Sequence, residues 1–192
     1  GGDDPPPGDA LLSAAFLPTP MREFATAPPI EERVGDALRA AESTVAVAES
    51  CTGGLIGSLL TDVPGSSAYF DRSAVTYSYE ATLPALGVSR EALDDHGAVS
   101  EPVAAEMAAG VRDVAGTDWG VATTGIAGPE GGTPEKPVGT VFVGLAYRGE
   151  WGTGDSYTRV ERHEFDGNRT QIKEQIARQA LETLLDAVDS RA

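Results

Sequence analysis

The spacing of apolar residues predicts alternating strands and helices from residue 29 onward. A short apolar run at 44–49 predicts a buried strand, and further strands are predicted at 70–77, 119–123, 138–147 and 157–165. Apolar residues recur at helical spacing at 29–41, 53–60, 80–86, 101–114 and 168–188, and no element is predicted for 88–99. Interleaved strands and helices indicate an α/β domain whose central sheet is covered by helices on both faces.

The last two strands predict that this sheet is mixed. They are separated only by the polar segment 148–155, which is too short for a helical crossover and favours a hairpin. The earlier strands are separated by helices, which favours parallel pairing among them.

The first 28 residues differ from the rest of the chain. They are rich in Gly, Pro and Asp and show no sustained period, so we expect a flexible lead-in to a folded domain that spans residues 29–192. Met21 is a candidate for the native first residue, in which case the residues before it are an added extension.

Composition narrows the class of protein. The chain has 192 residues, of which 41% are hydrophobic, which suits one domain with a sizeable core. No apolar run is long enough to span a membrane. The single cysteine, Cys51, excludes an internal disulfide and a cysteine-based zinc site. Together with the lack of a secretory signal, this favours the cytoplasm.

The charge balance is strongly acidic. Fourteen basic residues against 30 acidic ones give a net charge of −16, which disfavours nucleic-acid binding through a basic face. Lysine occurs only at Lys136 and Lys173. An acidic, lysine-poor surface is typical of a protein adapted to high salt. At 1 M salt the screening length is about 3 Å, so repulsion between the acidic side chains is weak. The alternative is an acidic protein from an ordinary-salt environment.

Chemistry-bearing residues follow the first predicted strand. Ser50, Cys51 and Thr52 lie at a strand-to-helix junction, where backbone amides and a helix dipole stabilise anions and oxyanions. A hydroxyl there is a candidate nucleophile. The alternative is a structural role, in which Ser50 or Thr52 caps the helix. Cys51 is expected to be a small buried residue.

Two further candidates stand at the ends of predicted elements. Tyr77 ends the second predicted strand, where a phenol can exchange a proton with a bound group, although the position alone favours a structural Tyr half-buried at the sheet edge. Arg169 begins the last predicted helix, where its charge opposes the helix dipole, so a bound anion or Asp166 would compensate it. An exposed arginine is the alternative.

A Gly- and Pro-rich loop is predicted at 125–137, directly after Thr124. Glycines let backbone amides approach a ligand, and Lys136 lies within the loop. A loop this long inside a compact domain is usually functional, and the alternative is an ordinary connection. The two histidines, His96 and His163, are expected to be structural or exposed, and the spacing of acidic residues indicates no metal site.

Three long segments resemble the CinA C-terminal domain family, whose members include nicotinamide mononucleotide deamidases. They are AESCTGGLIGSLLTDVPGSSAYF (48–70), HGAVSEPVAAEMAAGVR (96–112) and TTGIAGPEGGTPEKPVGTVFVGLA (123–146). The resemblance covers about residues 30–190. It implies a three-layer α/β/α fold, a homo-oligomer, and an amidohydrolase that converts nicotinamide mononucleotide to nicotinate mononucleotide and ammonia.

The resemblance also implies roles for single residues. The family's serine nucleophile falls on Ser50, its active-site tyrosine on Tyr77, its hydroxyl residue before the Gly-Ile-Ala-Gly-Pro segment on Thr124, and its substrate-contacting arginine on Arg169. The other expected substrate contacts are Cys51, Thr52, Gly53, Gly125 and Lys136. The expected ligand is a small nucleotide, with no cofactor and no metal.

One motif departs from the family. After the tyrosine the family pattern runs Asn-Glu-Ala-Lys, whereas this chain has Tyr79 and Thr82 in place of the Asn and the Lys. If that lysine activates the serine, this chain uses another group, is slow, or is not a deamidase. Two alternatives therefore stay open: a regulatory module that binds a pyridine nucleotide without turnover, and a serine amidohydrolase acting on another small amide.

Overall fold

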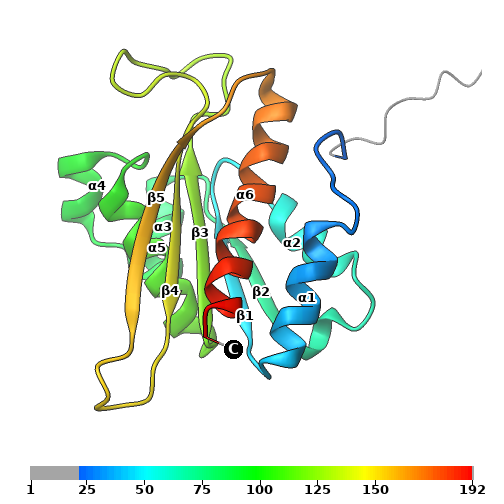
Figure 1. Ribbon diagram of the computed structural model, residues 1–192. Helices are drawn as coiled ribbons and strands as arrows, with labels where there is room; N and C mark the ends of the chain where they lie inside the picture. The colour runs from blue at the N-terminus through cyan, green and yellow to red at the C-terminus, as the bar shows by residue number, and fades with distance from the viewer. Residues whose placement is uncertain (1–21, 192) are drawn as a thin grey trace, which may run out of the picture.

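A five-stranded sheet forms the centre of the molecule (Figure 1). The computed structural model describes residues 22–191. The strands, in their order across the sheet, are β2 (Phe70–Val75), β1 (Val45–Glu49), β3 (Trp119–Gly125), β4 (Thr140–Tyr147) and β5 (Tyr157–Glu164). Each predicted strand is therefore present.

The sheet is mixed, as predicted. Strands β2, β1 and β3 pair in parallel, with Glu49 opposite both Val75 and Thr123, whereas β4 and β5 pair antiparallel. The carboxyl ends of the three parallel strands therefore meet at one edge, the usual place of ligand sites in α/β sheets.

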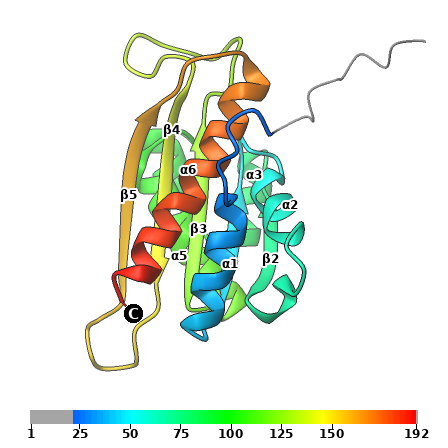
Figure 2. The same ribbon diagram turned by 45° about the vertical axis from the view of Figure 1, so that its right-hand side comes forward.

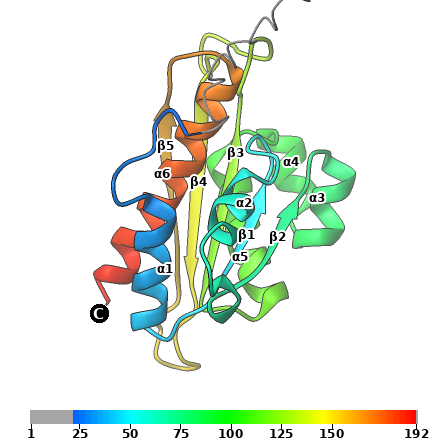
Figure 3. The ribbon, with the colours of Figure 1, turned by 90° about the vertical axis from the view of Figure 1, so that its right-hand side faces the viewer.

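Helices cover both faces of the sheet and confirm the three-layer α/β/α architecture. One layer contains α1 (Ile30–Ala40), α2 (Leu55–Thr61) and α6 (Arg169–Asp189), and the other contains α3 (Tyr79–Leu86), α4 (Arg90–His96) and α5 (Glu101–Ala115). Figure 2 shows α1 and α6 side by side, and Figure 3 shows α3, α4 and α5 on the opposite face. Each layer encloses its own cluster of buried apolar side chains.

Helix α4 was not predicted. It has seven residues, of which only Ala92 and Leu93 are buried, so it is too short to show an apolar period. Its local signal is the cap: Ser89 accepts a hydrogen bond from the Ala92 amide at 3.1 Å.

A buried ionic cluster fastens α1 to α6. The Arg178 guanidinium lies 2.8 Å from Glu174 on its own helix and 3.3 Å from Glu31 on α1. Glu174 also accepts hydrogen bonds from the amides of Glu23 and Phe24, which holds the start of the described chain against α6. Residues 1–21 of the predicted lead-in lie outside the described residues, so its extent stays a prediction.

None of the helices within residues 22–191 is both long and apolar enough to cross a membrane.

Candidate functional site

A pocket of about 270 Å³ opens at the carboxyl edge of the parallel strands. Four segments that are distant in sequence line it: the turn after β1, Tyr77 just after β2, the loop after β3 and the first turn of α6. The lining residues are Ser50, Cys51, Tyr77, Gly125, Ile126, Ala127, Gly128, Glu130, Gly131 and Arg169. In Figure 1 the loop after β3 and the start of α6 lie at the same end of the molecule.

Ser50 lies on a tight turn between β1 and α2. Its amide donates to the Thr123 carbonyl at 3.0 Å, and its own carbonyl accepts from the Gly53 amide at 3.1 Å. Gly53 and Gly54 have φ values of 60° and 98°, in the left-handed region that glycine adopts at little cost. The two glycines therefore let the chain turn sharply enough to present Ser50 at the pocket.

Glu49 holds this turn from inside. Its carboxylate is fully buried and accepts hydrogen bonds from the amides of Gly54, Ile56 and Gly57 at 2.9–3.1 Å, and from the Ser73 hydroxyl at 2.7 Å. The carboxylate thus occupies the amino-terminal donors of α2 itself. Sequence analysis missed this role, although an acidic residue closing an apolar strand was its visible signal.

Because Glu49 uses those donors, fewer amides remain for a ligand. Within the described turn, the Gly53 amide donates to the Ser50 carbonyl and the Gly54 amide to Glu49, while the amides of Cys51 and Thr52 donate to the Cys51 thiol and to no backbone carbonyl. An anion stabilised by this turn therefore has to replace the thiol sulfur as the acceptor of those two amides.

Arg169 connects three of the segments that form the pocket. Its guanidinium donates one hydrogen bond to the Tyr77 hydroxyl at 2.9 Å and another to the Gly128 carbonyl. No ion pair with Asp166 or any other carboxylate within residues 22–191 compensates this arginine. The side chain instead fixes the Tyr77 phenol, which is 66% exposed, beside the loop.

The loop after β3 is an ordered wall of the pocket. The Ile126 amide donates to the Thr140 carbonyl at 2.8 Å, and the Gly139 amide donates to the Ile126 carbonyl at 2.7 Å. A Cβ atom at Gly125 would lie 2.7 Å from the Thr140 carbonyl oxygen, so no larger residue fits this strand end. Close backbone packing therefore explains why residue 125 is a glycine, and no ligand contact is needed to explain it.

Thr124 and Lys136 lie outside the pocket lining. The Thr124 hydroxyl donates to the Ala98 carbonyl at 2.7 Å, and the Lys136 ammonium donates to the Val99 carbonyl at 2.6 Å. Both side chains thus secure the connection between α4 and α5. Thr124 is only 1% exposed.

Two further predicted contacts also lie outside the lining. Thr52 is fully buried, and its hydroxyl is 2.9 Å from that of Thr123. Gly53 is exposed and does not line the pocket. The structure therefore brings Ser50, Cys51, Tyr77, Gly125 and Arg169 to one pocket, and leaves Thr52, Gly53, Thr124 and Lys136 around it.

Cys51 is buried, as predicted. Burial raises the pKa of its thiol to about 12, although hydrogen bonds from the Cys51 and Thr52 amides oppose the shift. The thiol is therefore protonated at neutral pH and unsuited to nucleophilic attack, since the thiolate is the reactive form.

Lys173 is a cation near the pocket that sequence analysis did not select. It lies one helical turn after Arg169 on α6, and its ammonium is 3.6 Å from the position that a Cβ atom at Gly53 would take. No carboxylate of the described chain forms an ion pair with it. Its signal in the sequence was the four-residue spacing from Arg169.

The two histidines are placed away from the pocket lining. His96 ends α4 and is exposed, and His163 lies on β5, 3.2 Å from the Glu161 carboxylate. Over the described range, no group of three or more His, Cys, Asp or Glu side chains could hold a metal ion.

Comparison with known proteins places these features in a family. The family model described as the CinA C-terminal domain matches residues 27–188. Over 155 residues the chain is 48% identical to the nicotinamide-nucleotide amidohydrolase PncC of Escherichia coli, which covers 81% of this chain and 90% of that protein. It is 54% identical to a CinA-like protein of Salinibacter ruber, but it spans only 35% of that relative's length.

Solved structures agree with the observed architecture. A CinA superfamily protein from Klebsiella pneumoniae superposes with a TM-score of 0.77 at 35% identity, covering 84% of this chain and 96% of that one. A competence/damage inducible protein from Agrobacterium tumefaciens gives a TM-score of 0.75 at 40% identity, covering 83% and 93%.

Proposed function

The chain belongs to the CinA C-terminal domain family, and we propose that it hydrolyses the carboxamide of nicotinamide mononucleotide to nicotinate mononucleotide and ammonia. The similarity to an amidohydrolase, which the match covers over 90% of its length, supports this reaction. The observation that carries the proposal is the meeting of Ser50, Tyr77 and Arg169 at one pocket beside a strand-to-helix turn.

Ser50 is the proposed nucleophile. The carboxamide is attached to a cationic pyridinium ring, which withdraws electrons and makes the amide carbon more electrophilic. The Ser50 oxygen bonds to this carbon, and the carbon–nitrogen bond then breaks to release ammonia and leave an ester on Ser50. Water cleaves the ester, which restores the serine and releases the carboxylate product.

The oxyanion of the tetrahedral intermediate is assigned to the amides of Cys51 and Thr52. Neither Glu49 nor the local backbone uses these two amides, and the oxyanion takes the place of the Cys51 thiol as their acceptor. Thr124, the other predicted donor, would first have to release the Ala98 carbonyl. Losing one oxyanion donor typically costs about 3–4 kcal/mol of barrier.

Proton transfer is assigned to Tyr77. The family's lysine position is taken by Thr82, which is buried and bonded to the Ser78 carbonyl at 2.9 Å. The Lys136 ammonium is likewise occupied by the Val99 carbonyl. Tyr77 lines the same pocket as Ser50, and Arg169 orients its hydroxyl, so the phenol is the group best placed to relay the serine proton.

The substrate phosphate requires a local positive charge, because the net charge of −16 opposes it. Arg169 and Lys173 supply two cations one turn apart on α6, on the side that faces the Ser50 turn. We assign the phosphate to this pair, since neither cation forms an ion pair with a carboxylate within the described chain.

The test is to incubate the purified chain with nicotinamide mononucleotide and to quantify both products. Ammonia and nicotinate mononucleotide released in equal amounts support the proposal. Tight binding of the nucleotide with no ammonia would support a regulatory module instead. Ammonia from other small amides in a panel, but not from this nucleotide, would support a different amidohydrolase. Homo-oligomeric assembly and a cytoplasmic location stay predictions of the sequence.

A further inference from the structure

A second pocket lies at the opposite edge of the sheet, where α1 and α6 end and β1 and β3 begin. It measures about 460 Å³, and its lining includes Ala41, Ser43, Trp119, Tyr147, Val188 and Arg191. None of these residues lines the Ser50 pocket. Small apolar side chains, aromatic rings and polar groups share its lining.

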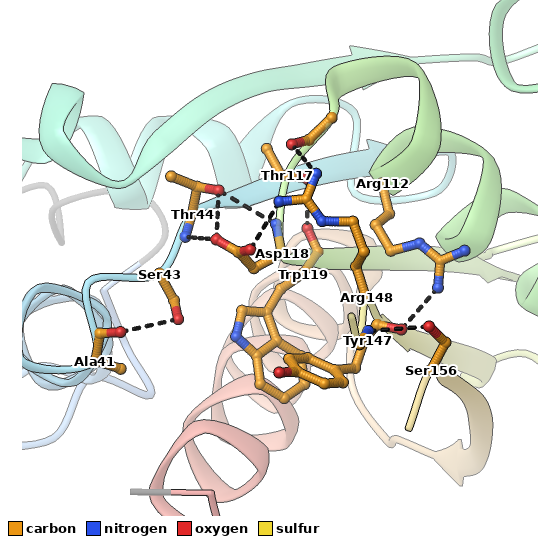
Figure 4. A network of polar contacts seen from close by, with 12 residues as sticks. Ala41, Ser43, Thr44, Arg112, Thr117, Asp118, Trp119, Tyr147, Arg148 and Ser156 are labelled. Atoms are coloured by element: carbon orange, nitrogen blue, oxygen red, sulfur yellow. Dashed lines mark hydrogen bonds and ion pairs between the residues drawn. The ribbon is translucent and has the colours of Figure 1, made fainter. Parts of the chain in front are cut away.

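The Trp119 indole is the first polar feature. The side chain is 1% exposed, and its N–H has no hydrogen-bond partner among the described residues. Figure 4 shows the indole nitrogen on the edge of the ring that faces Ser43 and Ala41, which also line the pocket. A buried donor without an acceptor is costly, so an acceptor delivered from the pocket would relieve it.

The Arg191 guanidinium is the second polar feature of the pocket. Its guanidinium lies 3.9 Å from the centre of the Tyr147 ring, and no carboxylate within residues 22–191 pairs with it. In a chain with 30 acidic residues, a cation held on an aromatic face at the edge of a pocket is available to an anion.

Most carbonyls at the neighbouring helix ends already have donors. At the end of α1, the amides of Ala41, Glu42 and Ser43 already donate to the carbonyls of Ala37, Arg39 and Leu38. At the end of α6, Ser190 and Arg191 amides donate to the carbonyls of Asp186 and Val188. Capping of helix carbonyls therefore does not explain why Trp119 and Arg191 face this pocket.

A polar network beside the pocket holds the start of β3 in place. The Asp118 carboxylate accepts from the Thr44 amide and hydroxyl, both at 2.9 Å, and pairs with Arg148 at 2.9 Å (Figure 4). Burial alone would raise the pKa of Asp118, but these hydrogen bonds and the Arg148 charge hold it below its ordinary value. The Trp119 amide donates to the Thr44 carbonyl, so the tryptophan has a fixed position before any ligand binds.

We propose that this pocket binds a small aromatic carboxylate. The ring packs against Ala41, Val188 and the aromatic side chains, while the carboxylate pairs with Arg191 and accepts the Trp119 N–H. The site is separate from the Ser50 pocket, so the inference does not depend on the proposed amidohydrolase reaction.

The test uses benzoate and the fluorescence of Trp119. The chain has two tryptophans, and Trp151 is fully exposed, so the Trp151→Phe variant leaves Trp119 as the reporter. We expect a saturable change in its emission with benzoate and a far weaker response to the neutral isostere benzamide. Arg191→Gln, at an exposed position, should weaken benzoate binding by about tenfold or more, whereas Arg90→Gln, an exposed arginine on α4, should leave it unchanged.

Arg169→Gln separates the two pockets. Benzoate binding that survives Arg169→Gln and weakens with Arg191→Gln supports the proposal. The proposal is overturned if benzoate gives no saturable change, if benzamide binds as well as benzoate, or if Arg191→Gln binds like its parent. Calorimetry of the Trp119→Phe variant adds a direct check, since loss of the N–H alone should weaken binding.

Discussion

Glu49 shows how a residue outside the pocket shapes its chemistry. A buried carboxylate with four hydrogen-bond donors but no cation among them is stable because each oxygen is satisfied. By taking the amino-terminal amides of α2, it leaves only the amides of Cys51 and Thr52, which now donate to the Cys51 thiol, for the proposed oxyanion. The shape of the turn that carries Ser50 and the choice of oxyanion donors thus depend on one side chain.

Replacing Glu49 with Gln tests this role with almost no change in volume. The glutamine NH₂ would face amide N–H groups that also donate, so at least one buried donor loses its acceptor. We expect the free energy of unfolding to fall by about 1–3 kcal/mol and the turnover rate to fall with it. Ser73→Ala, which removes one donor only, is the matched control and should cost about 1 kcal/mol. A Glu49→Gln variant as stable and active as the parent would contradict the assignment.

Cys51 predicts a loss of stability at alkaline pH. Its folded pKa of about 12 lies above the ordinary value of 9.0, so above pH 9 the unfolded chain loses the thiol proton while the folded chain keeps it. The stabilising contribution is complete below pH 9 and disappears between pH 9 and 12. At pH 10.5 the loss relative to pH 8 is about 2 kcal/mol.

Urea unfolding of the parent and of Cys51→Ala at both pH values measures this loss. The difference between the two proteins isolates the thiol, because the other titrating groups are common to both. An equal decline in the two proteins would show that the thiol does not contribute.

At the scale of elements, the sequence pattern predicted each strand, the mixed pairing and five of the six α-helices found within residues 22–191, because buried faces leave a period in the sequence. Helix α4 was not predicted, because its two buried residues are too few to form a periodic apolar pattern. The pattern placed Ser50 and Tyr77 at strand ends, and parallel pairing then brings those ends together. The pattern could not predict where the side chains of Thr124 and Lys136 point. Both donate hydrogen bonds to the connection before α5, and that contact depends on how the helices and loops pack in the folded chain.

Helix α6 carries both cations assigned to the phosphate, and Lys173 tests that assignment. We expect Lys173→Gln to raise the KM for nicotinamide mononucleotide about tenfold with little change in kcat, since a phosphate contact is made equally in the ground and transition states. Nicotinamide riboside, which lacks the phosphate, is the control substrate, and its kcat/KM should not change. A KM effect of the same size on both substrates would remove Lys173 from the phosphate site.

At the scale of the whole molecule, the net charge of −16 predicts a stability that rises with salt. The repulsion is effective at about 0.15 M salt, where the screening length is roughly 8 Å, and weak at 1 M, where it is about 3 Å. We expect the Tm to increase by several degrees between 0.1 and 2 M KCl, followed by circular dichroism. Potassium chloride is used because strongly excluded salts also strengthen hydrophobic burial. A Tm that stays constant or falls would contradict the high-salt hypothesis.

Ammonia release from nicotinamide mononucleotide by Ser50→Ala, measured beside the parent, tests the central assignment most directly. Ser58→Ala, an exposed serine on α2, is the matched control and should retain full activity. We predict that Ser50→Ala folds normally and loses turnover by a factor on the order of 10³ or more. Ammonia released by a folded Ser50→Ala at the parent rate would contradict the account.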